Sequence, residues 1–146
     1  MPYAAKMKSL FASCMILLLY VPAVAGERQA MGSADILALL PGMTMTGSYA
    51  DGVKFTETYF PDKSIAYQDD RSSDTGHWFE KDGLFCTFYA SLQGACFKVV
   101  RTGANCYEYY TAEGQDGVKS EPAANWNSVG WDIKQPSTCD LSDKVV

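Results

Sequence analysis

From residue 43 onward, short segments of alternating apolar and polar residues are separated by turn residues. These segments are rich in Thr, Val, Tyr and Phe, and Asp-Gly pairs follow two of them, at 51–52 and 82–83. A period of two is typical of β-strands, and Asp-Gly suits two-residue hairpin turns in which both central residues have positive φ. The pattern predicts seven strands, at residues 43–50, 53–60, 64–68, 76–81, 84–90, 95–101 and 105–111.

Strands joined by such short turns predict an up-and-down antiparallel meander. Residues 69–75 are expected to form a polar loop, 118–121 could add an eighth strand, and 131–133 could be a last pairing segment. A meander of this length usually curls into a small barrel or a strongly twisted sheet, which removes its exposed edges. The predicted fold class is all-β, with about seven to eight antiparallel strands preceded by one short helix.

The predicted helix begins after residue 32. Ser33 can cap its N-terminus, Asp35 lies near its positive end, and Pro41-Gly42 ends it. A helix this short must pack on a larger body to be stable. Residues 26–32 are expected to be a flexible lead-in to a single β-domain over 33–146.

The first 25 residues have the pattern of a cleavable signal peptide. Lys8 precedes an apolar run over 10–21, Pro22 ends the run, and Ala23-Val24-Ala25 supplies the small residues of a cleavage site. The run is too short for a comfortable membrane span. Cys14 precedes most of the run, whereas a lipoprotein cysteine should follow it. We therefore expect a periplasmic or secreted chain with no stable membrane anchor after cleavage.

Cleavage would remove one of the 5 cysteines. Cys14 lies in the signal, and the domain keeps Cys86, Cys96, Cys106 and Cys139. An even count in a small exported domain indicates two disulfides, for which three connectivities exist. Cys86 and Cys96 flank one hairpin and can meet across it, and Cys106 would then pair with Cys139. Zinc binding is a weaker interpretation, because no spacing resembles C-x2-C.

The chain is acidic, with a formal net charge of −5, and loss of Lys6 and Lys8 with the signal would make it −7. An acidic surface repels nucleic-acid phosphates and anionic lipids and attracts basic proteins. We therefore expect no nucleic-acid partner. The candidate partners are a basic protein or a small apolar ligand.

The sequence offers little catalytic chemistry. His77 is its one histidine, and the neighbouring acids Asp74 and Glu80 form no recognisable motif with it. The segment 69–74 gathers three carboxylates but lacks the regular spacing of a calcium loop. There is no P-loop, dinucleotide fingerprint, nucleophile elbow or HExxH motif. We predict a protein that is not an enzyme and has no cofactor, with a hydrolase using His77 as a distant alternative.

Aromatic side chains are the predicted binding residues. Trp126 and Trp131 flank a polar segment, while Tyr107 and Tyr109 share one face of a strand and Tyr110 lies on the other. Such side chains can stack on a ligand or anchor a protein partner. The alternative is that they fill one end of the barrel, since Trp is well buried on average.

Three motifs occur together in the middle of the chain: Gly76-x-Trp78, Asp82-Gly83-Leu84-x-Cys86-x-x-Tyr89 and Cys96-x-x-Val99-x-x-x-Gly103. With Gly47-x-Tyr49 before them, they resemble a family of small exported alphaproteobacterial proteins of unknown function. The resemblance covers roughly residues 35–111 and implies a periplasmic β-domain with a Cys86–Cys96 bridge and no assigned activity. Gly-x-Trp is also similar to a lipocalin and avidin motif, but there it opens the first strand.

These patterns lead to two main hypotheses of function. The first is a non-enzymatic module that binds a protein or envelope component, with a basic hydrolase such as lysozyme as a specific target, because opposite charges speed encounter. The second is a lipocalin-like carrier of a small apolar ligand, although Phe, Tyr and Trp could fill so small a barrel. A cavity of about several hundred Å³ would favour the carrier.

Overall fold

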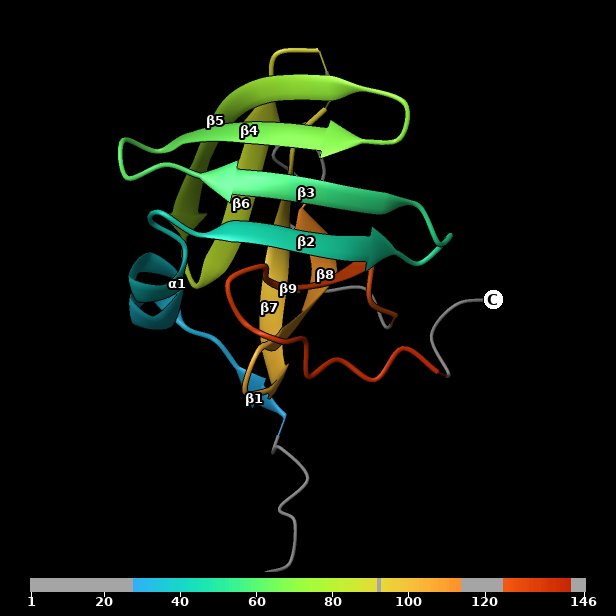
Figure 1. Ribbon diagram of the computed structural model, residues 1–146. Helices are drawn as coiled ribbons and strands as arrows, with labels where there is room; N and C mark the ends of the chain where they lie inside the picture. The colour runs from blue at the N-terminus through green and yellow to red at the C-terminus, as the bar shows by residue number, and fades with distance from the viewer. Residues whose placement is uncertain (1–27, 92, 114–124, 143–146) are drawn as a thin grey trace, which may run out of the picture.

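The computed structural model describes residues 28–91, 93–113 and 125–142, and within them eight strands close into an antiparallel barrel (Figure 1). This confirms the predicted all-β meander with one short preceding helix. The elements are β1 (Gln29–Ala30), α1 (Ser33–Leu39), β2 (Thr44–Tyr49), β3 (Lys54–Tyr59), β4 (Ser64–Asp69), β5 (Ser73–Lys81), β6 (Leu84–Tyr89), β7 (Ala95–Gly103), β8 (Cys106–Glu113) and β9 (Ser128–Asp132).

The barrel consists of β2 to β9, each strand pairing with the next in the chain. The last strand, β9, closes the barrel by pairing with both β8 and β2. Strand β7 has two neighbours along one edge: its first residues pair with β6, and Val100 and Arg101 pair with β1. Strand β1 therefore covers the part of this edge that lies beyond β6.

The prediction of a polar loop at 69–75 is wrong, because four of these seven residues belong to strands. Asp69 ends β4 and Ser73 begins β5, so that a turn of three residues connects them. The Asp69 carboxylate holds this turn, since Oδ1 accepts hydrogen bonds from the backbone N–H groups of Arg71 (2.7 Å) and Ser72 (2.6 Å). The first residues of β5 are polar on both faces, and alternation therefore gave no signal there.

The Asp-Gly pairs at 51–52 and 82–83 form different turns. Asp82 and Gly83 have φ values of 53° and 83°, which confirms the predicted two-residue turn. At 51–52 the prediction is wrong, because Gly52 has positive φ (87°) and Asp51 does not. Ala50 joins this turn, and the N–H of Tyr49 donates to the Val53 carbonyl across it (2.9 Å).

The segment before the barrel differs from prediction in two places. The N-cap of α1 is Gly32 rather than Ser33, and the Gly32 N–H donates to the Asp35 carboxylate (3.0 Å) while the Ser33 hydroxyl donates to Glu80 (2.6 Å). Gln29–Ala30, expected in a flexible lead-in, pair with β7 instead. The predicted signal peptide and the candidate strand at 118–121 lie outside the described residues.

The helix end of the barrel is filled by a hydrophobic core. Trp78 is fully buried there, and its ring N–H donates to the Phe60 carbonyl (3.2 Å). Ile36 and Leu40 add apolar side chains from the helix and the residue that caps it. The other members of this core are Met31, Met43, Met45, Tyr59, Ile65, Phe85, Val99, Tyr107 and Tyr109. No helix in the described part of the chain is long and apolar enough to cross a membrane.

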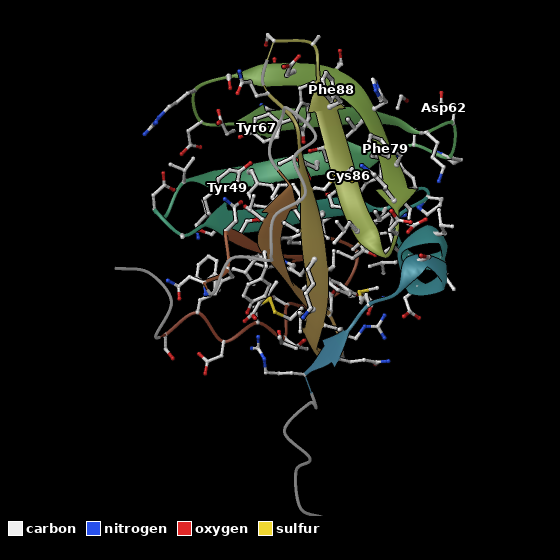
Figure 2. All side chains as sticks on the ribbon, turned by 180° about the vertical axis from the view of Figure 1, so that it is seen from behind. Tyr49, Asp62, Tyr67, Phe79, Cys86 and Phe88 are labelled. Atoms are coloured by element: carbon white, nitrogen blue, oxygen red, sulfur yellow. A yellow bond between two sulfur atoms is a disulfide. The ribbon has the colours of Figure 1, made fainter. Side chains whose placement is uncertain are left out.

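Two disulfides form with the predicted pairing. Cys86–Cys96 joins β6 to β7, and Cys106–Cys139 ties the C-terminal segment to the start of β8. Along β6, alternation places Phe85 and Thr87 on the inner face of the barrel, where they are buried, and Phe88 on the outer face, where it is exposed. Figure 2 shows Phe79, Cys86 and Phe88 on the two neighbouring strands β5 and β6.

We expect the Cys106→Ser/Cys139→Ser variant to lose more stability than Cys86→Ser/Cys96→Ser. The first bridge spans 33 residues and the second 10, so that the losses should be about 4 and about 3 kcal/mol on the chain-entropy model. Urea unfolding followed by tryptophan fluorescence would measure both. The reverse order would show that the tail bridge constrains the unfolded chain less than its length implies.

Candidate functional site

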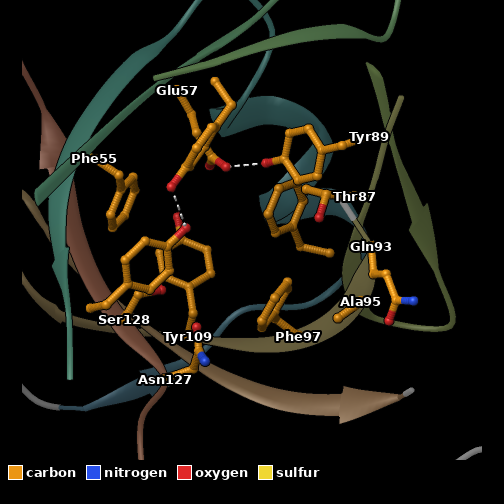
Figure 3. Close-up of a pocket in the computed structure, with 13 residues that line it drawn as sticks. Phe55, Glu57, Thr87, Tyr89, Gln93, Ala95, Phe97, Tyr109, Asn127 and Ser128 are labelled. Carbon is orange, nitrogen blue, oxygen red and sulfur yellow. Dashed lines mark hydrogen bonds between the residues drawn. The ribbon is translucent and has the colours of Figure 1, made fainter. Parts of the chain in front are cut away.

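A cavity of about 300 Å³ occupies the barrel end opposite the helix (Figure 3). Side chains from seven strands surround it, and Gln93 and Asn127 lie where it reaches the solvent. Seven aromatic residues supply much of its wall: Tyr49, Phe55, Tyr67, Phe85, Tyr89, Phe97 and Tyr109. The site is therefore a mostly apolar cup, closed below by the core around Trp78 and Met45.

The strand register aims these side chains inward and leaves room beside them. Gly47 on β2 pairs directly with both Phe55 and Gly130. A Cβ atom on Gly47 would lie 2.2 Å from the Val129 carbonyl oxygen and 2.7 Å from the Phe55 ring. Without that Cβ, the Phe55 ring can lie flat against the barrel wall, where its centroid is 4.8 Å from that of Tyr49.

Glu57 is the one acidic side chain among the described residues that line the cavity. It is 8% exposed, and its two carboxylate oxygens accept very short hydrogen bonds from the hydroxyls of Tyr59 and Tyr89. Burial raises the pKa of the Glu57 carboxyl, and the two hydroxyls oppose that rise. The described lining contains no Lys, Arg or His, so the cavity itself supplies no counter-charge.

The tyrosine hydroxyls around the cavity stay protonated at neutral pH. Burial raises the pKa of Tyr49 to about 12. Burial, followed by the nearby Glu57 charge, also raises the pKa of Tyr89 and Tyr109. Each hydroxyl therefore keeps one proton to donate, and the direction in which it donates determines what a ligand would meet.

All four tyrosines that line the cavity donate to groups of the protein. Tyr89 donates to Glu57 and Tyr109 donates to the Met45 sulfur (3.0 Å). Tyr49 donates to the Tyr67 oxygen (3.5 Å), and Tyr67 donates to the Asp69 carboxylate (2.8 Å). Since each hydroxyl has a single proton, these side chains present oxygen lone pairs to the cavity.

The turns around the cavity carry more acids than bases. Asp69 at this rim has a pKa lowered to about 2, first by the backbone N–H of Arg71 and then by the Tyr67 hydroxyl. The charged residues of these turns that the structure describes are Asp51, Lys54, Asp69, Asp70, Arg71 and Asp74. The described part of the rim is therefore negative at neutral pH, in keeping with the net charge of the chain.

The four predicted binding residues do not share one surface. Tyr107 and Tyr109 point into the barrel, and of the four Tyr109 is the one that lines the cavity. Trp131 is half-buried on the outer face of β9, where it pairs with Thr46. Trp126 is also half-buried and lies just before Asn127 at the cavity end.

His77 lies outside the barrel and away from the cavity. It is exposed, and its ring stacks on Phe88 with 5.8 Å between centroids. Asp74 and Glu80 lie on the opposite, inward face of β5, because residues at odd and even positions alternate. The described residues contain no group of three or more His, Cys, Asp or Glu that could hold a metal.

Sequence reasoning missed Glu57, although the sequence carries a signal for it. Phe55, Glu57 and Tyr59 alternate with Thr56 and Thr58. An acid in phase with two aromatic residues is an acid on the buried face of the strand, and a buried acid is a candidate functional residue. The missing step was to decide that the aromatic face of this strand is the inner one.

These features define a closed eight-stranded antiparallel barrel with an aromatic cup, whose described lining contains one carboxylate. Comparisons of the chain with protein-family models, curated proteins and solved structures find no match. The resemblance to the alphaproteobacterial family therefore stays a prediction from the motifs.

Glu57 should make the stability of the protein depend on pH. Its raised pKa means that the native state binds this proton more tightly than the unfolded state, so this contribution to stability is present at acidic pH and is lost as the pH rises through the native pKa. Relative to wild type, Glu57→Gln should therefore gain stability between pH 4 and pH 8. Urea midpoints of both proteins at several pH values would measure the difference. A difference that stays constant or shrinks with pH would contradict the raised pKa.

Proposed function

We propose that the barrel binds a small, mostly apolar ligand in the aromatic cup and carries it outside the cytoplasm. The main support is the cavity of about 300 Å³ with its seven aromatic side chains. Ordinary ligand pockets have volumes of about 300–1,000 Å³, are mostly apolar and hold a few well-placed polar groups. Glu57 and the tyrosine hydroxyls are such groups here, which favours a ligand of one or two rings.

The protein-binding hypothesis has less support from the same residues. It requires an exposed aromatic surface, whereas Tyr107 and Tyr109 are each 4% exposed and point inward. Trp126 and Trp131 keep partial exposure on separate parts of the barrel. An inhibitor of a basic hydrolase therefore rests on the acidic charge and on the exposed rings of Phe79 and Phe88 on β5 and β6. The carrier rests on a defined cavity.

The proposed place of action is an oxidising compartment outside the cytoplasm. The two disulfides support it, because such bonds persist in exported proteins and are rare in the reducing cytosol. A cleavable signal peptide and a periplasmic location are part of this proposal. In this reading the protein is a lipocalin-like carrier in the general sense of a barrel that holds one small ligand.

Filling the cavity should abolish ligand binding. Ala95 lines the cup, and Ala66 on β4 lies on the outer face of the barrel between Thr58 and Thr75. We expect Ala95→Phe to weaken binding of the neutral fluorescent probe N-phenyl-1-naphthylamine at least about tenfold, which corresponds to about 1.4 kcal/mol. The matched variant Ala66→Phe should bind like wild type.

Probe fluorescence titrations would measure both affinities, and urea unfolding would establish that both variants are folded. Equal affinities of Ala95→Phe and wild type would place the probe outside the cup. Absence of probe binding to the wild-type protein would contradict a carrier of neutral apolar ligands.

A further inference from the structure

We infer that the ligand of the cup is a small organic cation, an amine or quaternary ammonium on an aromatic or aliphatic body, with its positive charge beside Glu57. This inference rests on the proposed function and adds the chemical class of the ligand. It is carried by three observations on the described residues, which concern the carboxylate, the hydroxyl protons and the rim of the cup.

The first observation is that the Glu57 carboxylate has hydrogen bonds but no cationic partner among the residues that the structure describes. Tyr59 and Tyr89 each donate to one of its oxygens. An ionised carboxylate has about four acceptor positions, so that these two hydroxyls leave capacity for another donor. Buried charges in proteins are ordinarily paired. A ligand ammonium would supply the positive charge that the described lining of the cup lacks.

A comparison with Glu108 shows the kind of cationic partner that the described surroundings of Glu57 lack. Glu108 is the second buried glutamate among the described residues, 1% exposed on the outer side of β8. It accepts a hydrogen bond from Tyr110 (2.7 Å) and also forms a salt bridge with Arg28 (2.7 Å). The protein therefore pairs its outer buried carboxylate with an arginine from the segment before β1. The buried carboxylate in the cup accepts from two tyrosines and has no equivalent arginine among the described residues that line the cup.

The second observation is the direction of the hydroxyl protons. Tyr49, Tyr67, Tyr89 and Tyr109 donate to acceptors of the protein, so their oxygens face the cup as acceptors. A carboxylate or phosphate ligand needs donors and would find these four tyrosine protons already used. The remaining donors in the described lining are the side chains of Thr87, Ser128, Gln93 and Asn127. An ammonium group needs acceptors and would find them. The negative faces of the aromatic rings also attract a cation.

The third observation is the charge around the entrance. Asp69 is ionised down to about pH 2 and lies at the end of β4, next to the cup. With Asp51, Asp70 and Asp74 against Lys54 and Arg71, the turns of this end are net negative. A negative entrance concentrates cations and repels anions. The rim and the interior of the cup therefore favour the same sign of ligand charge.

The test compares three probes of the same shape and different charge: 2-phenylethylamine, 2-phenylethanol and phenylacetate. Calorimetric titration of the oxidised protein at pH 7 should give an affinity for the amine at least about tenfold above that for the alcohol, with phenylacetate weaker than both. Glu57→Gln should reduce amine affinity at least about tenfold and leave alcohol affinity within about threefold, because loss of a buried charge partner affects the charged ligand.

Glu108→Gln is the matched control, because it neutralises a buried glutamate that also accepts a tyrosine hydrogen bond, outside the cup. We expect it to lower stability and to leave the affinities for all three probes unchanged. If it reduced amine affinity as much as Glu57→Gln does, the preference for cations would come from the overall charge of the protein, and the inference would be overturned.

A permanently charged probe separates the titration of Glu57 from that of the ligand. Affinity for phenyltrimethylammonium should rise between pH 4 and pH 8 in wild type, as Glu57 ionises, and much less in Glu57→Gln. Among the described residues, the titratable groups that face Glu57 are five tyrosines, one on its own strand and one on each of four other strands. They are Tyr59, Tyr89, Tyr49, Tyr67 and Tyr109. Their pKa values are all raised, so they do not ionise in this range.

The outcomes distinguish this inference from the proposed function. If the alcohol and the amine bound with equal affinity and Glu57→Gln changed neither affinity, the inference of a cationic ligand would be overturned. The proposal of a carrier would still stand. The conclusion would be the same if the wild-type protein bound N-phenyl-1-naphthylamine but not the amine, and if Ala95→Phe abolished binding of that neutral probe. If neither the amine nor the neutral probes bound to the wild-type protein, both proposals would fail.

Discussion

Closure of the sheet by β9 is the constraint on which the rest of the structure depends. By pairing with β2 and β8, this strand encloses one face of each barrel strand in a common interior. The pair Gly47 and Gly130 makes part of this contact, where a side chain on either glycine would collide with its neighbours. Once the barrel is closed, the alternation of residues along each strand determines which side chains point inward. The sizes of those side chains determine where the interior is filled and where a cavity remains.

The position of Glu57 follows from that closure and explains why the cup has a cost in stability. In an open sheet its carboxylate could reach water, whereas in the closed barrel it is confined with Tyr59 and Tyr89. Two hydrogen bonds offset only part of the loss of hydration, which is why burial still raises its pKa. Groups that cost stability in this way are found preferentially at functional sites.

Much of the fold could be predicted from the sequence, because it depends on local patterns. Alternation separated Phe85 and Thr87 from Cys86 and Phe88, and the hairpin placed Cys86 opposite Cys96. The site could not be predicted in the same way. Both faces of the central strands carry aromatic residues, so that the inner face is fixed only by closure, a pairing between segments far apart in the sequence. Without knowledge of that pairing, the sequence does not determine whether an acid that alternates in phase with aromatic residues lies on the inner or the outer face.

In the proposed carrier, the same hydrogen bonds that satisfy the buried hydroxyls also favour a cationic ligand. A buried hydroxyl must find an acceptor, and the acceptors within reach here are Glu57, Asp69, Met45 and a neighbouring tyrosine. Once each proton has such an acceptor, the lone pairs are left for a ligand. In this proposal, the tyrosine oxygens disfavour an anionic ligand without a basic or bulky residue in the described wall of the cup. The preference for a cation would follow from the hydrogen bonds inside the protein, which use the tyrosine protons and leave oxygen lone pairs for the ligand.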